Sequence, residues 1–353
     1  MIVVVLLAGS AAAQVQIPPG YEIVQLTENW YREDRPAINN HGQIVFTGRV
    51  AGDPASDEVF LYDDGELIRL TDDNVQDMCP DINDDGTIVW SRRIGADDIY
   101  GPTLEVVIWQ DGDLTRLTDD DRDDCAPQIN SLGHIVWYKW IRGGCMDCNA
   151  AIYFCDGETI QQISDADWSH QGPVINDDDW IVWARLDFCQ QPWWDSEIML
   201  YVPGGEPEVI SPAETYEPRA PTINNRGQVA WIFQIGYGEH GIELWENGVV
   251  TLFTDWGGGP RLNDRGDMCF YRWYDDQDTY QQWLYLNLQD RFYQLSDDPF
   301  WNIDGDINNA GEVVWSSGEY PWQADIRLLR RVPPDGMDAA TKVEASDVQA
   351  VPP

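Results

Sequence analysis

The segment CPDINDDGTIVW carries oxygen-bearing side chains at alternate positions. Asp81, Asn83 and Asp85 precede Gly86, and an apolar run follows. Oxygen ligands at every second residue, with a glycine for the sharp turn, are how a short loop holds Ca²⁺. Such a loop also needs a later bidentate carboxylate, and the downstream positions hold isoleucine and arginine instead. A tight turn that binds no ion is therefore the competing interpretation.

Histidine and carboxylate pairs are the other candidates for chemistry. His170 and His240 lie in loops of neighbouring segments and, with nearby Asp residues, would suit a metal-assisted lyase or hydrolase. His41 and His134 follow the Asn-rich turns instead. No G-x-S-x-G, H-E-x-x-H or P-loop motif is present in the sequence. Histidines with ordinary loop hydrogen bonds are commoner, so the sequence assigns no catalytic residue and leaves any metal ligands unknown.

The segment around Asp81 is one of seven copies. The others read RPAINNHGQIVF, APQINSLGHIVW, GPVINDDDWIVW, APTINNRGQVAW, GPRLNDRGDMCF and DGDINNAGEVVW. Their shared asparagines, 39 to 48 residues apart, are Asn39, Asn83, Asn130, Asn176, Asn224, Asn263 and Asn308. Seven residues after each asparagine stands an aromatic residue: Phe46, Trp90, Trp137, Trp183, Trp231, Phe270 and Trp315. A repeat of this length, built from short apolar runs, indicates a β-propeller or a solenoid.

Comparison of the copies favours the turn over the calcium loop. The position two residues before the asparagine holds Ala37, Asp81, Gln128, Val174, Thr222, Arg261 and Asp306. Only the second copy has all three oxygen ligands and its glycine. All seven keep the asparagine, which can bond the backbone two residues on, and six keep a glycine that tolerates positive φ. The fourth copy has Asp179 in place of that glycine, so we expect a different turn there.

Each unit continues with an apolar run, a turn and another run. EVFLYDDGELIRLTDD and EVVIWQDGDLTRLTDD show the pattern, and Asp-Gly or Asn-Gly pairs between apolar runs are strong hairpin signals. No helical periodicity is visible, so the apolar runs are expected to be strands. Each unit has room for four of them. The last unit lacks its final strand, and YEIVQLTEN near the N-terminus matches the missing piece. The sequence predicts an all-β, seven-bladed β-propeller of four-stranded blades, closed by an N-terminal strand that completes the last blade.

The run RLTDDN…CPDINDDGTIVW…EVVIWQDGDLTRLTDD resembles the WD40-like (PD40) repeat of TolB-type β-propellers. Residues on the family pattern are Pro80, Asp85, Gly86, Asp111, Gly112, Arg116, Leu117 and Thr118. The resemblance spans the repeats and implies that the Pro-to-Gly segment is the innermost strand of each blade and its turn. The chain departs from the pattern because Ile-Asn replaces Trp-Ser, the second Pro is absent and the following strand is one residue shorter. It is identified as a divergent member, and no motif selects among family functions, which include periplasmic scaffolding, sugar lyases and peptidase gating domains.

Composition excludes several classes of partner. The 353 residues include 62 acidic and 21 basic side chains, for a formal charge of -41. Such a surface repels nucleic-acid phosphates and anionic lipid, so no nucleic-acid partner is expected. The same acidity suits cations, basic partners or a saline habitat. No segment is long and apolar enough for a transmembrane anchor, and we expect a monomer.

The chain ends predict export. Residues 1–13 hold an apolar run and the small-residue site Ala11-Ala12-Ala13, which is typical of a signal peptide, although a buried strand is the alternative. Residues 14–20 form a short lead, 21–332 the propeller, and 333–353 a disordered acidic Pro/Ala tail. The expected location is therefore periplasmic or extracellular.

Seven cysteines fit an exported protein with a few disulfides. Cys145 and Cys148 form a C-x-x-C, but a zinc site would need a second such pair. We therefore expect at least one disulfide among Cys145, Cys148, Cys155 and Cys189. Cys79 and Cys125 occupy similar places before their prolines and are expected to pair across adjacent blades.

Ligand binding is expected on the face where the copies differ. The loops there are rich in carboxylates and aromatics, notably Trp30, Trp140, Trp168, Trp193, Trp194, Trp256, Trp273 and Trp301. On the innermost strands Asp81, Gln128, Arg261 and Asp306 alternate with apolar residues and should point towards the axis. Exposed aromatics beside acids suit a sugar or a cation, whereas tryptophans that pack on one another are the alternative. The aromatics seven residues after each asparagine are instead expected to pack between blades.

These observations favour an exported, non-catalytic propeller that acts as a binding or scaffold module through its acidic, Trp-rich loop face. Its ligand would be a protein or a glycan, contacted by Asp81, Gln128, Arg261, Asp306, Trp193, Trp194, His170 and His240. No cofactor is required, and Ca²⁺ is the one cation that the loops suggest. The alternative is a polysaccharide-active propeller, a lyase or hydrolase, with a metal or His/Asp site at the tunnel mouth.

Overall fold

The computed structural model describes residues 15–28, 32–49, 57–94, 103–141, 149–187, 195–236, 239–275, 277–319, 323–332, 343–344 and 349–350. Within these residues the regular structure is β-strand, apart from one 3₁₀ turn at Asn287–Gln289. No described helix is long and apolar enough to cross a membrane. The all-β prediction is confirmed.

The strands form four-stranded antiparallel sheets in chain order. The sheets of the first half are β3 (Arg32–Ile38), β4 (Ile44–Arg49), β5 (Glu58–Asp63) and β6 (Glu66–Arg69); β7 (Asp77–Ile82), β8 (Ile88–Ile94), β9 (Thr103–Gln110) and β10 (Asp113–Arg116); and β11 (Asp124–Ile129), β12 (Ile135–Ile141), β13 (Asn149–Cys155) and β14 (Ile160–Gln162). A single parallel pair, Ala150 with Ser169, joins β13 to the sheet that follows.

The second half repeats the arrangement. Its sheets are β15 (Ser169–Ile175), β16 (Ile181–Asp187), β17 (Asp195–Tyr201) and β18 (Glu208–Val209); β19 (Arg219–Ile223), β20 (Val229–Gly236), β21 (Glu239–Glu246) and β22 (Val249–Thr254); β23 (Gly258–Leu262), β24 (Met268–Tyr274), β25 (Thr279–Leu286) and β26 (Arg291–Gln294); and β27 (Trp301–Ile307), β28 (Val313–Glu319) and β29 (Gln323–Arg331) with β1 (Tyr21–Gln25). The last sheet therefore takes its outer strand from the N-terminal end of the chain.

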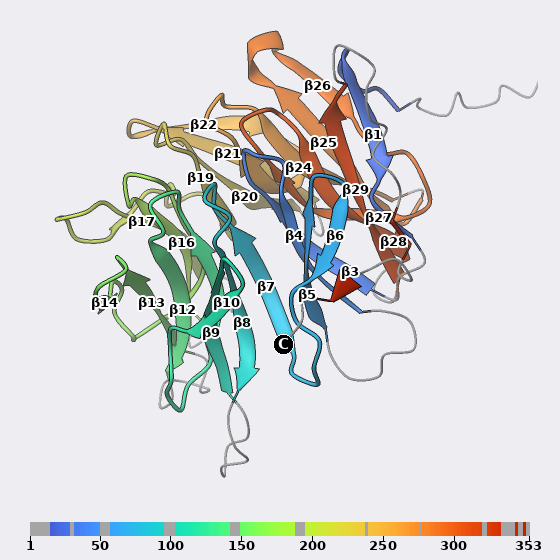
Figure 1. Ribbon diagram of the computed structural model, residues 1–353. Helices are drawn as coiled ribbons and strands as arrows, with labels where there is room; N and C mark the ends of the chain where they lie inside the picture. Colours follow the sequence, from blue (N-terminus) through green and yellow to red (C-terminus); the bar gives the residue numbers. More distant parts are fainter. Residues whose placement is uncertain are drawn as a thin grey trace, which may run out of the picture.

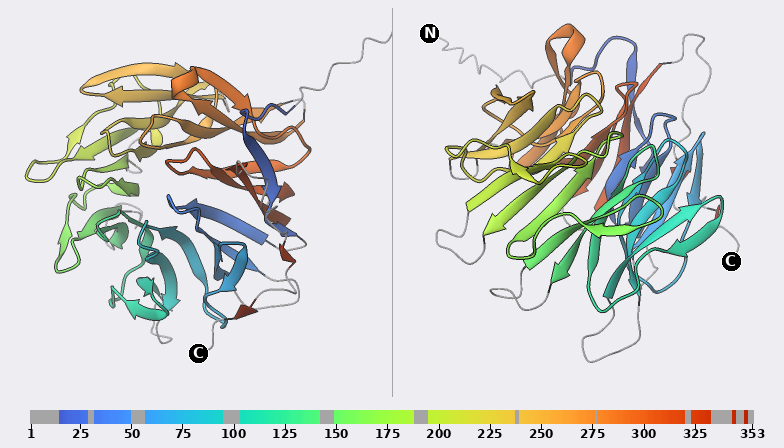
Figure 2. Two further views of the ribbon diagram at one scale, coloured as in Figure 1. Left: turned by 45° about the horizontal axis from the view of Figure 1, so that its top comes forward. Right: turned by 90° about the vertical axis from the view of Figure 1, so that its left-hand side faces the viewer.

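The sheets stand around a common axis, and the strand that carries the asparagine motif is innermost in each (Figures 1 and 2). These inner strands are β3, β7, β11, β15, β19, β23 and β27. Each contacts the inner strand of the next sheet, and β27 contacts β3. Four-stranded sheets arranged in this way are the architecture of a β-propeller.

Short strands from both chain ends add to this framework. β2 (Thr27–Glu28) pairs in parallel with β30 (Val343–Glu344), and β31 (Gln349–Ala350) pairs in parallel with β6. The remainder of 333–353, like residues 1–14, lies outside the described residues. The signal peptide and the disordered tail therefore stay predictions.

Every inner strand has a β-bulge at the same place. Pairing with the neighbouring strand shifts register between the residue five before the asparagine and the residue two before it, for example between Met78 and Asp81. The residue four before the asparagine has φ between 48° and 59°; these residues are Arg35, Cys79, Ala126, Gly172, Ala220, Gly259 and Asp304. In six copies a proline follows, which has no N–H to donate to the ladder and is tolerated at a bulge. The bulge changes the direction of the strand where it approaches the axis.

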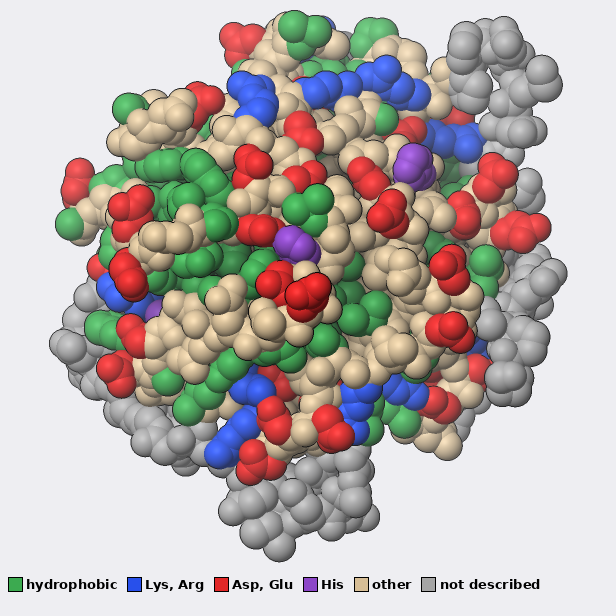
Figure 3. Space-filling view, turned by 60° about the vertical axis from the view of Figure 1, so that its left-hand side comes forward, with side chains coloured by type: hydrophobic (Ala, Val, Ile, Leu, Met, Phe, Trp, Pro, Cys, Tyr) green, Lys and Arg blue, Asp and Glu red, His purple; other side chains and the backbone are tan. Residues whose placement is uncertain are grey.

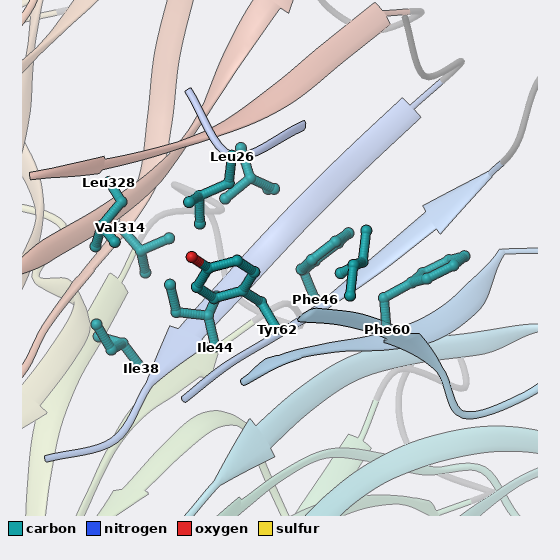
Figure 4. Close-up of a cluster of buried hydrophobic side chains, with 10 residues drawn as sticks. Leu26, Ile38, Ile44, Phe46, Phe60, Tyr62, Val314 and Leu328 are labelled. Atoms are coloured by element: carbon teal, nitrogen blue, oxygen red, sulfur yellow. The ribbon is translucent and has the colours of Figure 1, made fainter. Parts of the chain in front are cut away.

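The aromatics seven residues after the asparagines are completely buried between sheets. Phe46, Trp90, Trp137, Trp183, Trp231, Phe270 and Trp315 all have 0% exposure. Trp90 packs with Val45 and Val59 of the preceding sheet, and Phe46 packs with Val314 and Leu328 of the last sheet. Figure 4 shows the latter cluster, in which Leu26 and Tyr62 converge with these residues. Their predicted packing role is confirmed.

The motif asparagines form a continuous chain of hydrogen bonds around the axis. In each turn the Oδ1 atom accepts the N–H groups of the residues two and four positions on; for Asn83 these are Asp85 at 3.1 Å and Thr87 at 3.0 Å. The Nδ2 atom donates to the backbone carbonyl of the next motif asparagine at 2.9–3.2 Å, and Asn308 donates to Asn39. The predicted turn is confirmed, and the bond to the next repeat is an addition that the sequence did not predict.

The turn of the fourth copy corrects a prediction. Asp179 was expected to impose a different turn, but its φ of 58° resembles that of the glycines in the other copies. Its N–H donates to the Asn176 carbonyl at 3.1 Å, as the Gly86 N–H does to Asn83. Aspartate adopts this left-handed conformation more readily than most residues. The Asp179 carboxylate also accepts from Asn130 at 3.0 Å and contacts His134 Nδ1 at 2.8 Å, which links it to the preceding copy.

The asparagine ring predicts a large local cost for one side chain. Replacing Asn176 by alanine removes three hydrogen bonds at a residue only 3% exposed and leaves two backbone N–H groups without their acceptor. We expect the free energy of unfolding to fall by about 1–3 kcal/mol, measured by urea denaturation. The exposed Gln161→Ala is the matched control and should change it by less than about 0.5 kcal/mol. Equal effects of the two substitutions would contradict a stabilising role for the ring.

The pairing of β1 with β29 predicts that the N-terminal strand stabilises the fold. Its five residues pair from Tyr21 with Arg331 to Gln25 with Arg327. Deleting residues 1–25 exposes the edge of β29, so we expect a lower melting temperature and self-association by size-exclusion chromatography. Deleting only residues 1–14 is the control. A 1–25 deletion that stays monomeric and melts like the control would show that β1 is dispensable.

Candidate functional site

The residues that differ among the inner strands line one cavity on the axis. It has a volume of about 380 Å³. All seven residues two before the asparagines line it: Ala37, Asp81, Gln128, Val174, Thr222, Arg261 and Asp306. The structure therefore brings together the four predicted inner-strand site residues. Six of the bulge residues also line it, namely Arg35, Cys79, Ala126, Gly172, Ala220 and Asp304.

The two carboxylates of this set hold neighbouring inner strands together. Asp81 Oδ2 accepts the N–H of Ile129 at 2.8 Å, and Asp306 Oδ2 accepts the N–H of Ile38 at 2.9 Å. Burial raises the pKa of Asp81 to about 7, and the nearby Asp306 acts in the same direction. Burial also raises the pKa of Asp306, although Arg261 opposes this shift. Both acids thus combine a structural hydrogen bond to the neighbouring strand with a pKa that burial raises.

Gln128 and Arg261 are held by their own strands. The Gln128 amide donates to the carbonyl of Pro127 at 3.2 Å, and Arg261 Nη1 donates to that of Pro260 at 3.1 Å. Arg261 therefore places a positive charge in the same cavity as Asp81 and Asp306, in a protein that is strongly acidic elsewhere. A cavity with both signs of charge offers donors and acceptors to one polar ligand.

A second group of polar residues at the cavity was missed by the sequence analysis. Arg35 Nη1 donates to Cys79 Sγ at 2.7 Å. Burial raises the pKa of Asp304, and the nearby Arg35 opposes this rise. Burial likewise raises the pKa of the Cys79 thiol, against the effect of Arg35. The available signal was their common position four residues before the asparagine, where the bulge turns them towards the axis.

A smaller cavity lies beside the first, between β3 and the last sheet. Its volume is about 220 Å³, and its walls include Arg35 and Asp304, which also line the axial cavity. The other lining residues are Arg32, Glu33, Asp34, Trp301, Ile303, Ser316, Gly318, Gln323 and Ala324. We call it the seam cavity, because it lies where the first and last sheets meet. The shared residues make the two cavities neighbours on one face.

The structure brings neither predicted histidine to these cavities. His170 is 1% exposed; its Nδ1 accepts the indole N–H of Trp183 at 2.7 Å, so Nε2 carries the proton and faces Asp165 at 3.2 Å. Burial lowers its pKa. His240 Nε2 lies 2.7 Å from Arg219 Nη2, and burial lowers its pKa too. Each histidine is therefore engaged within its own sheet.

The tryptophans of the loop face are partly outside the described residues. Trp30, Trp193 and Trp194 are among those, so their predicted role stays a prediction. Of the described ones, Trp301 packs edge-on against Tyr280 and Trp273, with ring centres 5.1 and 6.1 Å apart. Arg185 lies over Trp168 at 4.8 Å and Arg272 over Trp256 at 4.6 Å. Mutual packing thus accounts for part of the aromatic content of this face.

The opposite end of the axis is lined by the repeated turns. A cavity of about 170 Å³ is surrounded by the motif asparagines and their immediate neighbours. Asp84, Asp177 and Asp264 follow three of the asparagines, and each accepts a backbone N–H from the preceding repeat at 2.8–2.9 Å. Nearly identical residues repeat around this end, and their polar groups bond to one another. Among the described residues, no group of three or more His, Cys, Asp or Glu is placed to hold a metal ion.

The described cysteines correct one disulfide prediction. Cys79 and Cys125 are both free thiols, as are Cys155 and Cys269. Cys79 lines the axial cavity, whereas Cys125 occupies the preceding position of its repeat and is buried. The two cysteines therefore occupy different positions relative to the bulge of their strands. Cys145, Cys148 and Cys189 lie outside the described residues, so disulfides among them stay untested.

Negative charge is spread over the surface. On the face shown in Figure 3, Asp and Glu side chains are scattered and outnumber Lys and Arg. Many basic residues are already paired with acids, as Arg116 is with Glu105 at 3.2 Å and Arg49 with Asp57 at 3.1 Å. Arg35 and Arg261 add positive groups to the axial cavity.

Comparisons with known proteins support the fold. No protein-family model matches the chain, and no curated protein matches it in sequence. Solved structures do match. An oligogalacturonate lyase from Vibrio parahaemolyticus gives a TM-score of 0.66 at 11% identity, covering 91% of this chain and 96% of that one.

Peptidase propellers are similar to the same degree. The β-propeller domain of the Trilobed protease from Pyrococcus furiosus, described as having an open velcro topology, gives a TM-score of 0.62 at 11% identity and covers 88% of this chain and 100% of that one. The acylaminoacyl peptidase from Pyrococcus horikoshii gives 0.63 at 12% identity, covering 85% of this chain and 51% of that one. The chain thus spans about half of that peptidase's length. At these identities the comparisons establish the β-propeller fold alone.

The raised pKa of Asp81 predicts that the protein loses stability as pH rises from about 4 to 7. In this range the folded state keeps a proton on Asp81 that the unfolded chain, with a pKa near 3.9, has lost. The free energy of unfolding should therefore fall by up to about 1.4 kcal/mol per pH unit from this group. Asp306 of β27 and Arg261 of β23 are the charged groups that act on it.

Asp81→Asn isolates this contribution, because the amide oxygen can still accept the Ile129 N–H. Denaturation midpoints across pH 4–8 should vary less in the variant than in the wild type. Asp119→Asn, at a side chain 82% exposed, is the control for a change of one charge. If Asp81→Asn and Asp119→Asn shift the pH profile alike, Asp81 is not the titrating group.

Proposed function

We propose that the chain is an exported, seven-bladed β-propeller of the WD40-like TolB type, with β1 completing the last blade. It acts as a binding or scaffold module and carries out no chemistry of its own. The pairing of β1 with β29 and the asparagine bonds from Asn308 to Asn39 support the closed arrangement. Export rests on the residues at the N-terminus, and the strongly negative charge supports the absence of nucleic-acid partners.

The observation that carries the binding function is the contrast between the two ends of the axis. At the turn end the repeats are nearly alike, and their polar groups bond to one another. At the loop end, the corresponding strands present side chains that differ in size and charge, including Asp81, Gln128 and Arg261, around the axial cavity. Residues that vary while the framework repeats are suited to recognise an asymmetric ligand. A glycan or a protein segment with polar groups fits this cavity, and the monomer is the binding unit.

A polysaccharide-active enzyme is the second candidate. The observation that favours it is the match in size to the oligogalacturonate lyase, which covers 96% of that chain. The match therefore spans nearly all of that chain, whereas the acylaminoacyl peptidase extends well beyond the match. Release of shortened or unsaturated sugars from a polysaccharide by the purified protein would favour this candidate over a binding module.

The proposal predicts separate effects of two double variants on binding. Replacing Trp193 and Trp194 by alanine should weaken glycan binding by about 1–3 kcal/mol, or roughly 5- to 150-fold, on the scale of aromatic anchors. Replacing Asp81 and Asp306 by asparagine, which retains their backbone hydrogen bonds, should abolish any Ca²⁺ binding. Both are measured by calorimetric titration after a glycan array has identified the glycan.

Leu288→Ala is the control, since Leu288 is 99% exposed on the turn between β25 and β26. It should bind like the wild type. Equal affinities of the wild type and both double variants for glycan and Ca²⁺ would remove the loop face from consideration. The propeller would then be a scaffold that is contacted elsewhere.

A further inference from the structure

The charges of the axial cavity are gathered on one side of it. Its charged lining residues stand on β23, β27, β3 and β7, which contact one another in this order around the axis. They are Arg261, Asp304, Asp306, Arg35 and Asp81. The lining residues that come from β11, β15 and β19 are uncharged, and several are small, such as Ala126, Val174 and Ala220. The cavity therefore has a charged wall and an uncharged wall.

Opposite charges alternate along the charged wall without forming ion pairs. Asp304 of β27 stands between Arg261 of β23 and Arg35 of β3. Burial raises the pKa of Asp304, and both arginines oppose this rise, so the three groups lie close enough to interact. None of them, however, forms an ion pair with a residue that the structure describes. The arginines donate instead to the Cys79 thiol and the Pro260 carbonyl, and the Asp304 carboxylate has no hydrogen-bond partner among the described residues.

These three groups can be reached from the cavity. Arg35 and Asp304 are exposed, Arg261 is half-buried, and all three line the axial cavity. Arg35 and Asp304 also line the seam cavity beside it. Charged groups that protein surrounds but does not pair lose part of their hydration, and a ligand of matching charge can replace it. The volume of about 380 Å³ is in the range of small-molecule sites.

A ligand with a single charge would match only part of the charged wall. An anion bound to Arg261 would meet the like charge of Asp304 on the next strand, and a cation bound to Asp304 would meet both arginines. A zwitterion satisfies both signs at once. In an α-amino acid one carbon separates the ammonium from the carboxylate, so the two groups can contact side chains of neighbouring strands. An ammonium beside Asp304 would also favour the ionised form of its carboxyl group.

We propose that the axial cavity binds a free α-amino acid with an uncharged side chain. The ligand carboxylate pairs with Arg261, its ammonium pairs with Asp304, and its side chain lies against the wall formed by β11, β15 and β19. Pairs between arginine and a carboxylate are charge-assisted and frequently bidentate, which fixes the orientation of the ligand. The inference rests on the proposed binding function and gives the axial cavity a ligand class of its own, beside the glycan assigned to the tryptophans of the loop face.

Ligand-observed NMR by saturation transfer tests the site on the full chain. The probes are L-alanine, L-valine, L-leucine and L-phenylalanine at millimolar concentration. The amine that lacks the carboxylate and the acid that lacks the ammonium are the matched comparisons, which for leucine are isoamylamine and isocaproate. We expect transfer to at least one amino acid and at least tenfold weaker binding of its two comparisons. Absence of transfer to all four amino acids, or equal affinity of either comparison, would overturn the proposal.

Two variants separate the roles of the opposite charges. Arg261→Gln and Asp304→Asn should each weaken binding of the amino acid at least tenfold; asparagine tolerates the φ of 55° at this position. Arg261→Gln should not weaken binding of the amine, and Asp304→Asn should not weaken binding of the acid. The controls Arg226→Gln and Asp119→Asn make the same charge changes at side chains that are 47% and 82% exposed. If each variant binds the amino acid like its control, the charged wall holds water only.

Melting curves show whether each variant is folded; if one is not, the other variant and the comparison ligands decide. A glycan array probed with the same proteins separates this inference from the proposed function. A wild type that binds a glycan but none of the amino acids would reject the axial site and keep the loop face. Amino-acid binding that survives the change of Trp193 and Trp194 to alanine, in a protein that binds no glycan, would keep the axial site and reject the loop face.

Discussion

The amide of the motif asparagine fixes two levels of structure at once. Its oxygen accepts two N–H groups of its own turn, and its nitrogen donates to the next repeat's asparagine carbonyl, for instance from Asn83 to Asn130 at 3.2 Å. The conformation of the turn and the spacing of neighbouring inner strands are therefore set by one side chain. Few other residues have both an acceptor with two lone pairs and a donor on the same planar group. The bulge, the axial cavity and the buried aromatics all take their positions from this contact.

Because the turn end is fixed, variation is confined to the other end of each inner strand. The residues two and four before the asparagine reach the axis at identical places and need not resemble one another, as Arg35, Cys79 and Asp304 show. Two of these residues still stabilise the fold, because the carboxylates of Asp81 and Asp306 each accept a backbone N–H of the adjacent inner strand. Glu33 differs from them, because it is buried without a complete set of partners.

The structural features that the sequence predicted correctly are those present in every repeat. Comparison of the seven copies predicted the turn, the four-stranded sheets and the burial of Trp90 and its equivalents, because these patterns recur in each copy. The pointing of Asp81, Gln128, Arg261 and Asp306 towards one cavity followed from strand alternation. The failures concern single residues. Asp179 adopts the glycine conformation because aspartate tolerates it. Cys79 and Cys125 are free thiols, and they stand one position apart relative to the bulge of their strands. The sequence did not predict the seam cavity, because that cavity depends on how β3 packs against strands some 270 residues away.

The pairing of β1 with β29 places the two ends of the repeat region side by side, with Tyr21 opposite Arg331. The junction between first and last repeats is held by the same asparagine bond as every other junction, from Asn308 to Asn39. The contacts between the first and last repeats are thus of the same kind as those between other neighbouring repeats. A circular permutant that joins these ends and opens a different loop would satisfy the same set of hydrogen bonds. The cyclic order of contacts between the inner strands would stay the same, and only the position of the chain ends would change.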